Sequence, residues 1–186
     1  MSTAPLVMKF GGTSVGSAER LQRVVEIIAA EHARGPVAVV VSAMGATTDR
    51  LIEAVEAAAA GQKAQAEALV DGIADLAVSN AMGALAALEA PSGGIHATVR
   101  SLLQPLREVL HGVGLLRERT PQTLDLVLSF GERLSATVLA QVLTARAVPA
   151  RYVDARDWTI TDDRFNHALV DWPATQAALD GLRPTW

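Results

Sequence analysis

The sequence predicts a parallel α/β layer fold, mainly from the order of elements over residues 6–60. Two short apolar runs, 6–10 and 37–41, are typical of buried strands, and the second is almost all valine. Each run is followed by a glycine-containing loop and then by a helical pattern. The order strand, loop, helix, strand, loop, helix is the signature of right-handed parallel connections.

Start and stop signals bound the two helices of this region. Ser17 is a good N-cap for a first helix, which Gly35 and Pro36 break. A turn at 45–47 precedes a second helix, and we expect Gly61 to end it.

The middle of the chain, about 62–146, is expected to be rich in helix. The stretch 62–88 is Ala-rich with helical spacing, and 91–94 is a clear break. Helical spacing resumes over 95–116, where Pro105 marks a kink or a new start.

The last third of the chain carries weaker signals. The Thr120–Pro121 pair is a good cap and first-turn residue for another helix. We expect Gly131 to separate that helix from a further one over 132–145. The run 150–153 indicates a return to strand, and the residues from Pro173 on suggest a short helix.

Composition argues against several classes of function. The net charge is -4 and the 16 Lys and Arg residues are scattered, so we expect no nucleic-acid partner and no polybasic membrane patch. The chain has no cysteine, which excludes disulfides, thiolate metal sites and a Cys nucleophile. Its four histidines show no ligand spacing, and Asp162 and Asp163 suit a turn better than a metal pair. No protein-held metal is expected.

The N-terminus lacks the basic region and long apolar region of a signal peptide. We also expect no apolar run long enough to span a bilayer. The predicted location is therefore cytoplasmic, with no membrane partner.

The first segment with chemical meaning is KFGGTSV, residues 9–15, where a strand ends and a helix follows. Two glycines let backbone amides approach an anion closely, and hydroxyls follow them. Lys9, one of only two lysines in the chain, could stabilise phosphoryl oxygens. The lysine precedes the glycines, so this is not a Walker A motif. The alternative is an ordinary strand-to-helix turn.

The second segment follows the second strand and reads SAMGATTD over 42–49. Hydroxyls and a glycine at the carboxyl end of a buried strand suggest a ligand crevice. The alternative is a simple turn with Thr48 or Asp49 as helix N-cap.

The third segment is SFGERLSA, residues 129–136. A Gly-Glu pair between two apolar helical runs could hold the Glu132 carboxylate inside a site, where it would accept charge-assisted hydrogen bonds. The alternative is a solvated glutamate, which is the usual state of a lone Glu.

These segments resemble the signatures of aspartate kinases, in the amino acid kinase superfamily. KFGGTSV resembles the family's opening signature, 39–49 its strand-and-loop, and 129–136 its Gly-Glu block. Two weaker stretches agree: 153–165, and 108–116, which is similar to bifunctional aspartate kinase–homoserine dehydrogenases. The resemblance covers nearly the whole chain.

The resemblance implies a three-layer α/β/α sandwich with a mostly parallel open sheet and a helical insertion. It also implies ATP-dependent phosphorylation of the L-aspartate β-carboxylate, with Mg²⁺ carried mainly by the nucleotide. This reaction belongs to lysine, threonine and methionine biosynthesis.

The resemblance assigns roles to eight residues. Lys9 would be catalytic, and Thr48 and Glu132 would orient L-aspartate, with Glu132 receiving its α-ammonium. Asp49 departs from the family pattern, where Asn is common, and adds a negative charge near an acidic substrate. The residues expected to bind nucleotide or phosphate are Lys9, Gly11, Gly12, Thr13, Ser14 and Ser42.

By this resemblance, residues 1–186 form the N-terminal portion of a catalytic domain. The C-terminal nucleotide-binding half and the regulatory ACT domains are expected to be absent, so the chain alone should show little or no kinase activity. Its partners would be ATP, L-aspartate, and either further copies of itself or a complementing C-terminal half. Two alternatives stay open: another enzyme of the superfamily, and a non-catalytic binding or assembly module.

Overall fold

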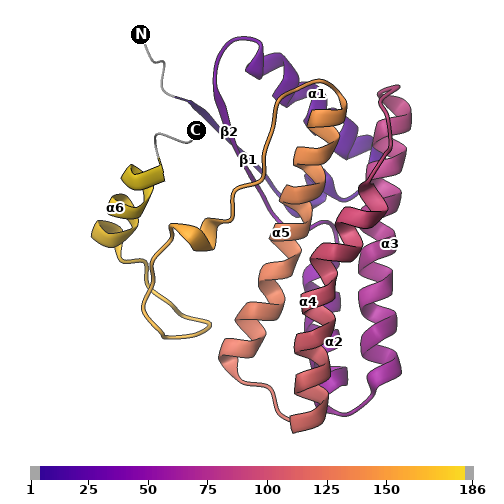
Figure 1. Ribbon diagram of the computed structural model, residues 1–186, viewed down its shortest axis with the longest axis vertical. Helices are drawn as coiled ribbons and strands as arrows, with labels where there is room; N and C mark the ends of the chain where they lie inside the picture. Colours follow the sequence, from indigo (N-terminus) through magenta and orange to yellow (C-terminus); the bar gives the residue numbers. More distant parts are fainter. Residues whose placement is uncertain (1–4, 183–186) are drawn as a thin grey trace.

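The computed structural model describes residues 5–182 and consists of a small parallel sheet beside a body of long helices (Figure 1). Its elements in chain order are β1 (Leu6–Phe10), η1 (Gly12–Val15), α1 (Ala18–His32), β2 (Val37–Val41), α2 (Thr47–Ala59), α3 (Lys63–Ala87), α4 (Ile95–Leu116), α5 (Pro121–Ala145), η2 (Ala155–Asp157) and α6 (Trp172–Leu182). The predicted α/β class is confirmed.

Strands β1 and β2 pair in parallel, in a register that places Lys9 beside Val40 and Phe10 beside Val41. Side chains alternate between the two faces of a strand. One face, with Phe10 and Val41, packs on the core. The other face carries Val7 and Val40, which are 67% and 54% exposed. Both strands lie where predicted, but they are less buried than expected because, within the described residues, no layer covers that second face.

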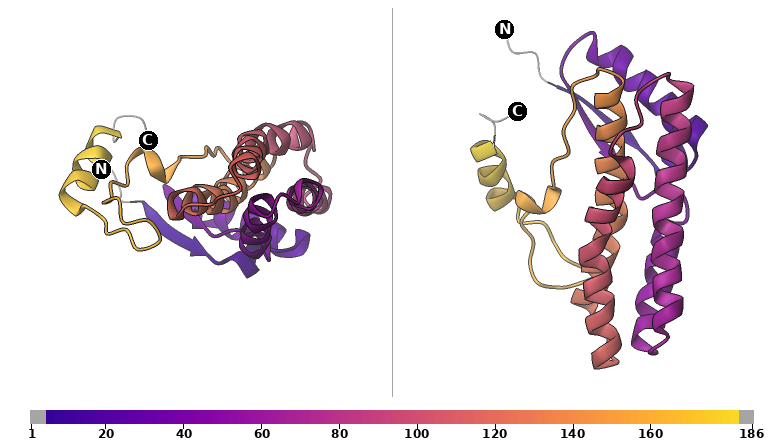
Figure 2. Two further views of the ribbon diagram at one scale, coloured as in Figure 1. Left: turned by 90° about the horizontal axis from the view of Figure 1, so that it is seen from below. Right: turned by 45° about the vertical axis from the view of Figure 1, so that its right-hand side comes forward.

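Four helices, α2 to α5, lie alongside one another beside the sheet (Figures 1 and 2). Each of the four contacts the other three, while α1 packs against α3 and β2. Their facing sides supply most of the buried apolar side chains, among them Leu51, Ile73, Leu103 and Leu134. The helix-rich middle of the chain is therefore the core of the molecule.

The helix signals are confirmed at most positions. Ser17 caps α1 by accepting a hydrogen bond from the Arg20 N–H, and Thr120 caps α5 in the same way from Thr123. Gly61 follows α2 in a left-handed conformation, with φ of +75°. Pro105 lies inside a continuous α4 and starts no new helix.

Two predictions about the last third of the chain are wrong. Gly131 does not separate two helices, because α5 runs unbroken from Pro121 to Ala145. The run 150–153 forms no strand, since no neighbouring strand pairs with it in the described part of the chain. The closing helix is confirmed as α6 and stands apart from the helical body (Figures 1 and 2).

The segment between α5 and α6 is held by a few polar contacts. Thr161 and Val170 form an isolated antiparallel bridge, and the Thr175 hydroxyl accepts a hydrogen bond from the Ile160 N–H. Asp125 of α5 accepts a bond from the backbone of Asn166. These contacts fix the segment without a regular sheet.

Two helices, α3 and α5, are long and apolar enough to cross a membrane by length and composition alone. The expectation that no apolar run reaches this length is therefore wrong. In these two helices, 39% and 56% of the apolar window is buried inside the protein. Core helices of soluble proteins share these features, so the two helices are weak signs of a membrane.

Candidate functional site

The loops after the two strands lie side by side at the carboxyl edge of the sheet. The Ser42 N–H donates to the Phe10 carbonyl at 3.1 Å, and the Gly45 N–H donates to the Gly12 carbonyl at 3.1 Å. These bonds extend the β1–β2 pairing beyond the strands. The first and second segments identified in the sequence therefore meet.

Gly12 packs tightly against Ala43 where these loops meet. A Cβ added to Gly12 would lie 2.3 Å from the Ala43 carbonyl oxygen, so only glycine fits there. Gly11 differs, because the nearest atom to its added Cβ is the Lys9 Nζ at 3.9 Å. Gly12 is needed for packing, whereas Gly11 leaves an open backbone position beside a positive charge.

Lys9 lies one residue before the end of β1, on the face of the sheet that also carries Val40. Its side chain is exposed, and its ammonium group turns toward Gly11. Among the described residues, no ion pair joins Lys9 to Glu132. The positive charge is therefore available to a ligand at this edge.

Glu132 reaches the same edge from the middle of α5. Its Oε1 accepts a hydrogen bond from the Ala43 N–H at 3.3 Å, a contact that spans 89 positions in the sequence. The residue as a whole is exposed. The third segment thus joins the first two, with one carboxylate oxygen bonded to the loop and the group open to solvent.

Thr47 and Thr48 have opposite surroundings at the start of α2. The Thr47 side chain is buried and donates its hydroxyl to the Met44 carbonyl at 2.6 Å, while Thr48 and Asp49 are exposed. The N-cap of α2 is Ala46, without a side-chain bond. The interpretation of Thr48 or Asp49 as the cap is therefore wrong, and Thr48 is free to contact a ligand.

The hydroxyl residues of the first segment lie in the short helix η1. The Ser14 N–H donates to the Gly11 carbonyl at 2.9 Å, which closes the turn. The Arg20 guanidinium donates to the Thr13 carbonyl at 3.0 Å and brings a second cation to this loop. Ser42 is half-buried at the end of β2.

The sequence profile of the amino acid kinase family matches residues 4–182. The chain belongs to the amino acid kinase family.

Relatives within this amino acid kinase family are aspartokinases. Aspartokinase 1, chloroplastic, of Arabidopsis thaliana is 34% identical over 180 residues, which are 93% of this chain and 30% of the relative. The aspartokinase of Chlamydia muridarum is 34% identical over 168 residues, 90% of this chain and 34% of the relative. The chain spans about a third of the length of these curated relatives.

The fold of this amino acid kinase chain also matches a solved structure. Escherichia coli aspartokinase III in complex with aspartate and ADP superposes with a TM-score of 0.79 over 98% of this chain and 38% of that protein. The sequence identity is 24%, so the likeness supports the fold alone.

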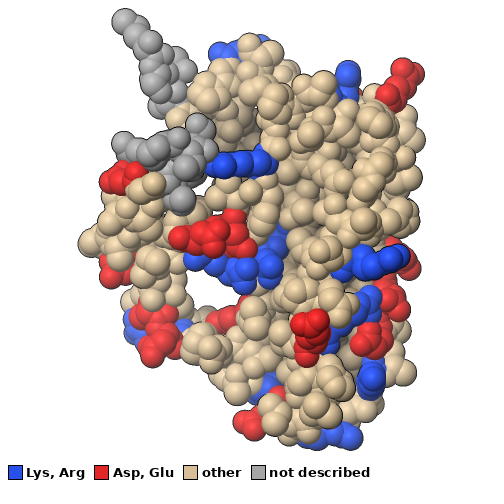
Figure 3. All heavy atoms as spheres, in the orientation of Figure 1, with Lys and Arg blue, Asp and Glu red and all other residues tan. Residues whose placement is uncertain are grey.

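Sequence reasoning missed two parts of the candidate site. Ala43 belongs to the second segment and contacts the other two: its carbonyl oxygen packs on Gly12, and its N–H donates to Glu132. The only sequence signal for it is a small residue two positions before Gly45. The other part is Asp154, which binds Arg133 and Arg156 beside Glu132. The Arg156 guanidinium holds the pKa of Asp154 down at about 2. On the face drawn in Figure 3, acidic and basic side chains meet where the segment after α5 lies beside the helices.

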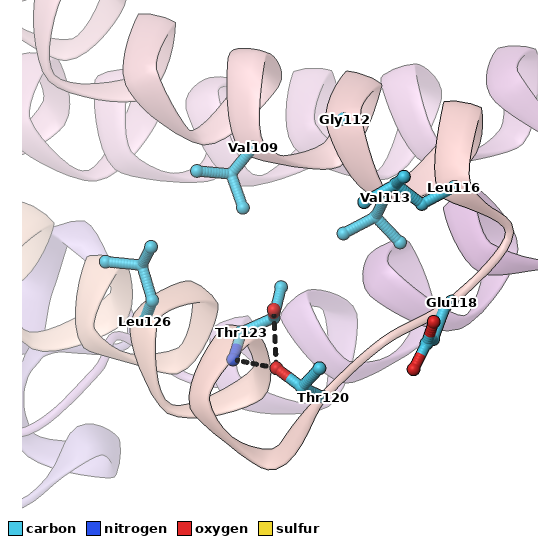
Figure 4. Close-up of a pocket in the computed structure, with 8 residues that line it drawn as sticks. All are labelled: Val109, Gly112, Val113, Leu116, Glu118, Thr120, Thr123 and Leu126. Atoms are coloured by element: carbon cyan, nitrogen blue, oxygen red, sulfur yellow. Dashed lines mark hydrogen bonds between the residues drawn. The ribbon is translucent and has the colours of Figure 1, made fainter.

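A pocket of about 250 Å³ opens elsewhere, between the end of α4 and the first turns of α5 (Figure 4). Val109, Val113 and Leu126 point into it, and the Thr120 and Thr123 hydroxyls bond each other at its edge. None of the predicted site residues lines this pocket. Its apolar walls do not suit a phosphate or a small dicarboxylate.

Within residues 5–182, no group of three or more His, Asp or Glu side chains is placed to hold a metal ion. The residues at the strand edge do fit a phosphate chain. Gly11 offers backbone without a side chain, Lys9 offers a positive charge beside it, and Thr13 and Ser14 follow.

Proposed function

We propose that this chain forms the N-terminal part of the catalytic domain of an aspartate kinase. The reaction transfers the γ-phosphoryl group of ATP to the β-carboxylate of L-aspartate. A bond forms between a carboxylate oxygen and the γ-phosphorus, the bond from that phosphorus to the β,γ-bridging oxygen breaks, and ADP leaves. The observation that supports this most directly is the meeting of Gly12, Ala43 and Glu132 at one edge of the sheet.

The first loop is proposed to handle the phosphates. Lys9 would neutralise the oxygens of the transferring phosphoryl group, since its ammonium lies free beside Gly11. The backbone at Gly11 and Gly12, with the hydroxyls of Thr13 and Ser14, would face the phosphate chain. Ser42, at the end of β2, would lie beside the nucleotide. Mg²⁺ would arrive on the nucleotide phosphates and neutralise their charge.

The other two segments are proposed to orient L-aspartate. Glu132 would accept hydrogen bonds from its α-ammonium, because one carboxylate oxygen remains unbonded by the loop. Thr48, exposed at the start of α2, would donate its hydroxyl to the substrate. Holding the carboxylate in line with the γ-phosphorus is the main contribution a protein makes to phosphoryl transfer.

Further proposals concern the surroundings of this catalytic unit. Residues 1–186 would act with a C-terminal nucleotide-binding half, in further copies of the chain or as a complementing partner. The product, 4-phospho-L-aspartate, would enter lysine, threonine and methionine biosynthesis in the cytoplasm. The aspartokinase names of the relatives support the reaction.

Amide resonances of the purified chain, followed by NMR, test the substrate assignment. We expect L-aspartate to shift resonances around Thr48 and Glu132, and D-aspartate and L-glutamate to shift them much less. Glu132→Gln should remove the response, whereas Glu53→Gln, on an exposed turn of α2, should leave it unchanged. A response to a different carboxylate would favour another enzyme of the superfamily, and no response to any would favour a non-catalytic module.

Catalysis is tested separately, by ADP release from ATP in the presence of L-aspartate. We expect little or no release from the chain alone. Aspartate-dependent release that disappears in Lys9→Ala would contradict that expectation and show that the described edge is a complete catalytic site.

A further inference from the structure

Gly131 occupies an unusual position, in the middle of a continuous helix. It is buried within α5, with Phe130 before it and Glu132 after it. Glycine inside a helix costs about 1 kcal/mol relative to alanine. Helix formation therefore gives no reason for this residue, and its surroundings must be considered.

The space around Gly131 is filled by the β2–α2 loop. A Cβ added to Gly131 would lie 2.8 Å from the Ala43 Cβ, 3.5 Å from Leu51 Cδ1 and 3.7 Å from Thr47 Cγ2. Two carbon atoms do not approach to 2.8 Å unless one of them shifts. Ala43 is only 3% exposed and lies in the close-packed interior, which resists such a shift. An alanine at 131 would push α5 and the loop apart.

The distance between α5 and the β2–α2 loop also determines whether Glu132 can bond that loop. The distance from Glu132 Oε1 to the Ala43 nitrogen is 3.3 Å, near the long end of the hydrogen-bond range. A displacement of about half an ångström would take it out of that range. The Ala43 methyl group packs on Gly131, and the Ala43 N–H bonds Glu132. The spacing at Gly131 therefore controls whether the hydrogen bond of Glu132 can form.

We propose that Gly131 is a positioning residue for Glu132: its missing side chain lets α5 approach Ala43 closely enough for the Glu132 carboxylate to bond the Ala43 N–H. This bond fixes where the carboxylate faces the edge of the sheet. Its consequence for L-aspartate rests on the proposed function, whereas the bond itself does not.

A substitution cycle followed by NMR tests the positioning role. In the parent chain, Glu132→Gln should shift the amide resonance of residue 43, because it changes the group bonded to that amide. In Gly131→Ala, the same Glu132→Gln change should leave that resonance nearly unmoved. Gly112→Ala in α4, where an added Cβ meets nothing within 4 Å, is the matched control and should preserve the response.

A methyl exchange provides the rescue. In the Ala43→Gly/Gly131→Ala double variant, the methyl group moves from one side of the contact to the other, and the response at residue 43 should return. In Ala43→Gly alone, Glu132→Gln should also shift the amide resonance of residue 43. If Gly131→Ala does not fold, the Ala43→Gly/Gly131→Ala double variant decides. The proposal is supported if Glu132→Gln still shifts the residue 43 amide in the double variant. It is overturned if that shift is lost in the double variant but kept in Ala43→Gly.

The L-aspartate affinity gives the second readout. If the parent chain binds L-aspartate, Gly131→Ala should weaken binding roughly tenfold, the effect of losing one charge-assisted hydrogen bond. A Gly131→Ala chain that is less stable yet keeps both the amide response and the affinity would overturn the proposal and leave Gly131 as packing alone. If the amide response follows the expected pattern and the parent binds no L-aspartate, the positioning role stands and the aspartate kinase assignment fails.

Discussion

Asp154 pairs with Arg133, with 3.4 Å between the Asp154 Oδ2 and the Arg133 Nε, and this pair ties the segment after α5 to the turn that holds Glu132. The Arg133 guanidinium lies over the Phe130 ring at 4.4 Å from its centre. Arg156 donates to both Asp154 oxygens, at 3.0 and 2.8 Å. One carboxylate thus holds two cations and fixes the chain beside the candidate site.

Asp154 should make stability depend on pH in the acid range. Its pKa falls from 3.8 to about 2 in the folded protein, first because of Arg156. A lowered folded pKa gives stability that is present above pH 4 and lost as the pH falls toward 2. We expect Asp154→Asn to cost roughly 1–2 kcal/mol at pH 7, less than the full shift implies because Arg156 is half exposed.

Urea unfolding at pH 7 and at pH 2.5 measures this effect. The difference in free energy of unfolding between the parent chain and Asp154→Asn should be smaller at the lower pH. Ser92→Ala, which changes an exposed uncharged residue, is the control, and its effect should not depend on pH. An Asp154→Asn difference that stays constant with pH would contradict the ion-pair explanation.

Gly11 and Gly12 should respond in opposite ways to alanine. Gly12→Ala places a methyl group 2.3 Å from the Ala43 carbonyl oxygen and should destabilise the chain by about 2–3 kcal/mol. Gly11→Ala meets only the end of Lys9 at 3.9 Å, at a backbone angle φ of -74° that alanine accepts, and should change stability by less than about 0.5 kcal/mol. Thermal unfolding of both variants measures the contrast, and equal losses would contradict it.

Much of the fold could be predicted because local signals and tertiary structure agree. β1, α1 and β2 have apolar patterns and capping residues that also suit their packed positions, so the sequence predicts them at nearly the observed bounds. The candidate site followed from these elements, because loops after parallel strands meet at one edge of the sheet.

The errors arise where local chemistry allows two outcomes. Gly131 looks like a helix break but serves a close contact, and the partner of that contact, Ala43, is far away in the sequence. The run 150–153 has the composition of a strand, but a strand forms only where another pairs with it. Burial decides between Thr47 and Thr48, and two adjacent threonines give no sequence signal of which side chain turns inward.

Arg107 should stabilise the contact between α3 and α4. Its guanidinium bonds Glu67 and also Asp71, at 2.7 Å for the latter, and the Arg107 side chain is 27% exposed. We expect Arg107→Met to cost about 1 kcal/mol, since the pairs are partly shielded while the apolar stem is retained. Arg100→Met, on an exposed position of the same helix, should be nearly neutral. Urea unfolding in the presence of about 1 M NaCl tests this, because salt screens ion pairs. The loss in free energy of unfolding caused by Arg107→Met should be smaller at high salt, and an unchanged loss would contradict an ionic origin.

The paired threonines at the start of α2 separate stability from binding. Thr47→Val removes a buried hydroxyl that donates to the Met44 carbonyl at 2.6 Å, so it should cost about 1 kcal/mol. The loss stays modest because the Thr47 N–H also donates to that carbonyl, at 3.0 Å. Thr48→Val changes an exposed side chain and should leave stability within about 0.5 kcal/mol.

Affinity should follow the other member of the pair. If Thr48 contacts L-aspartate, Thr48→Val should weaken its binding roughly tenfold, and Thr48→Ser, which keeps the hydroxyl, should restore most of it. Thr47→Val should change affinity little once the chain is folded. Calorimetric titration of the three variants with L-aspartate measures this pattern. A loss of affinity in Thr47→Val alone would mean that the shape of the loop, held by the buried hydroxyl, governs binding, and that Thr48 is not a ligand.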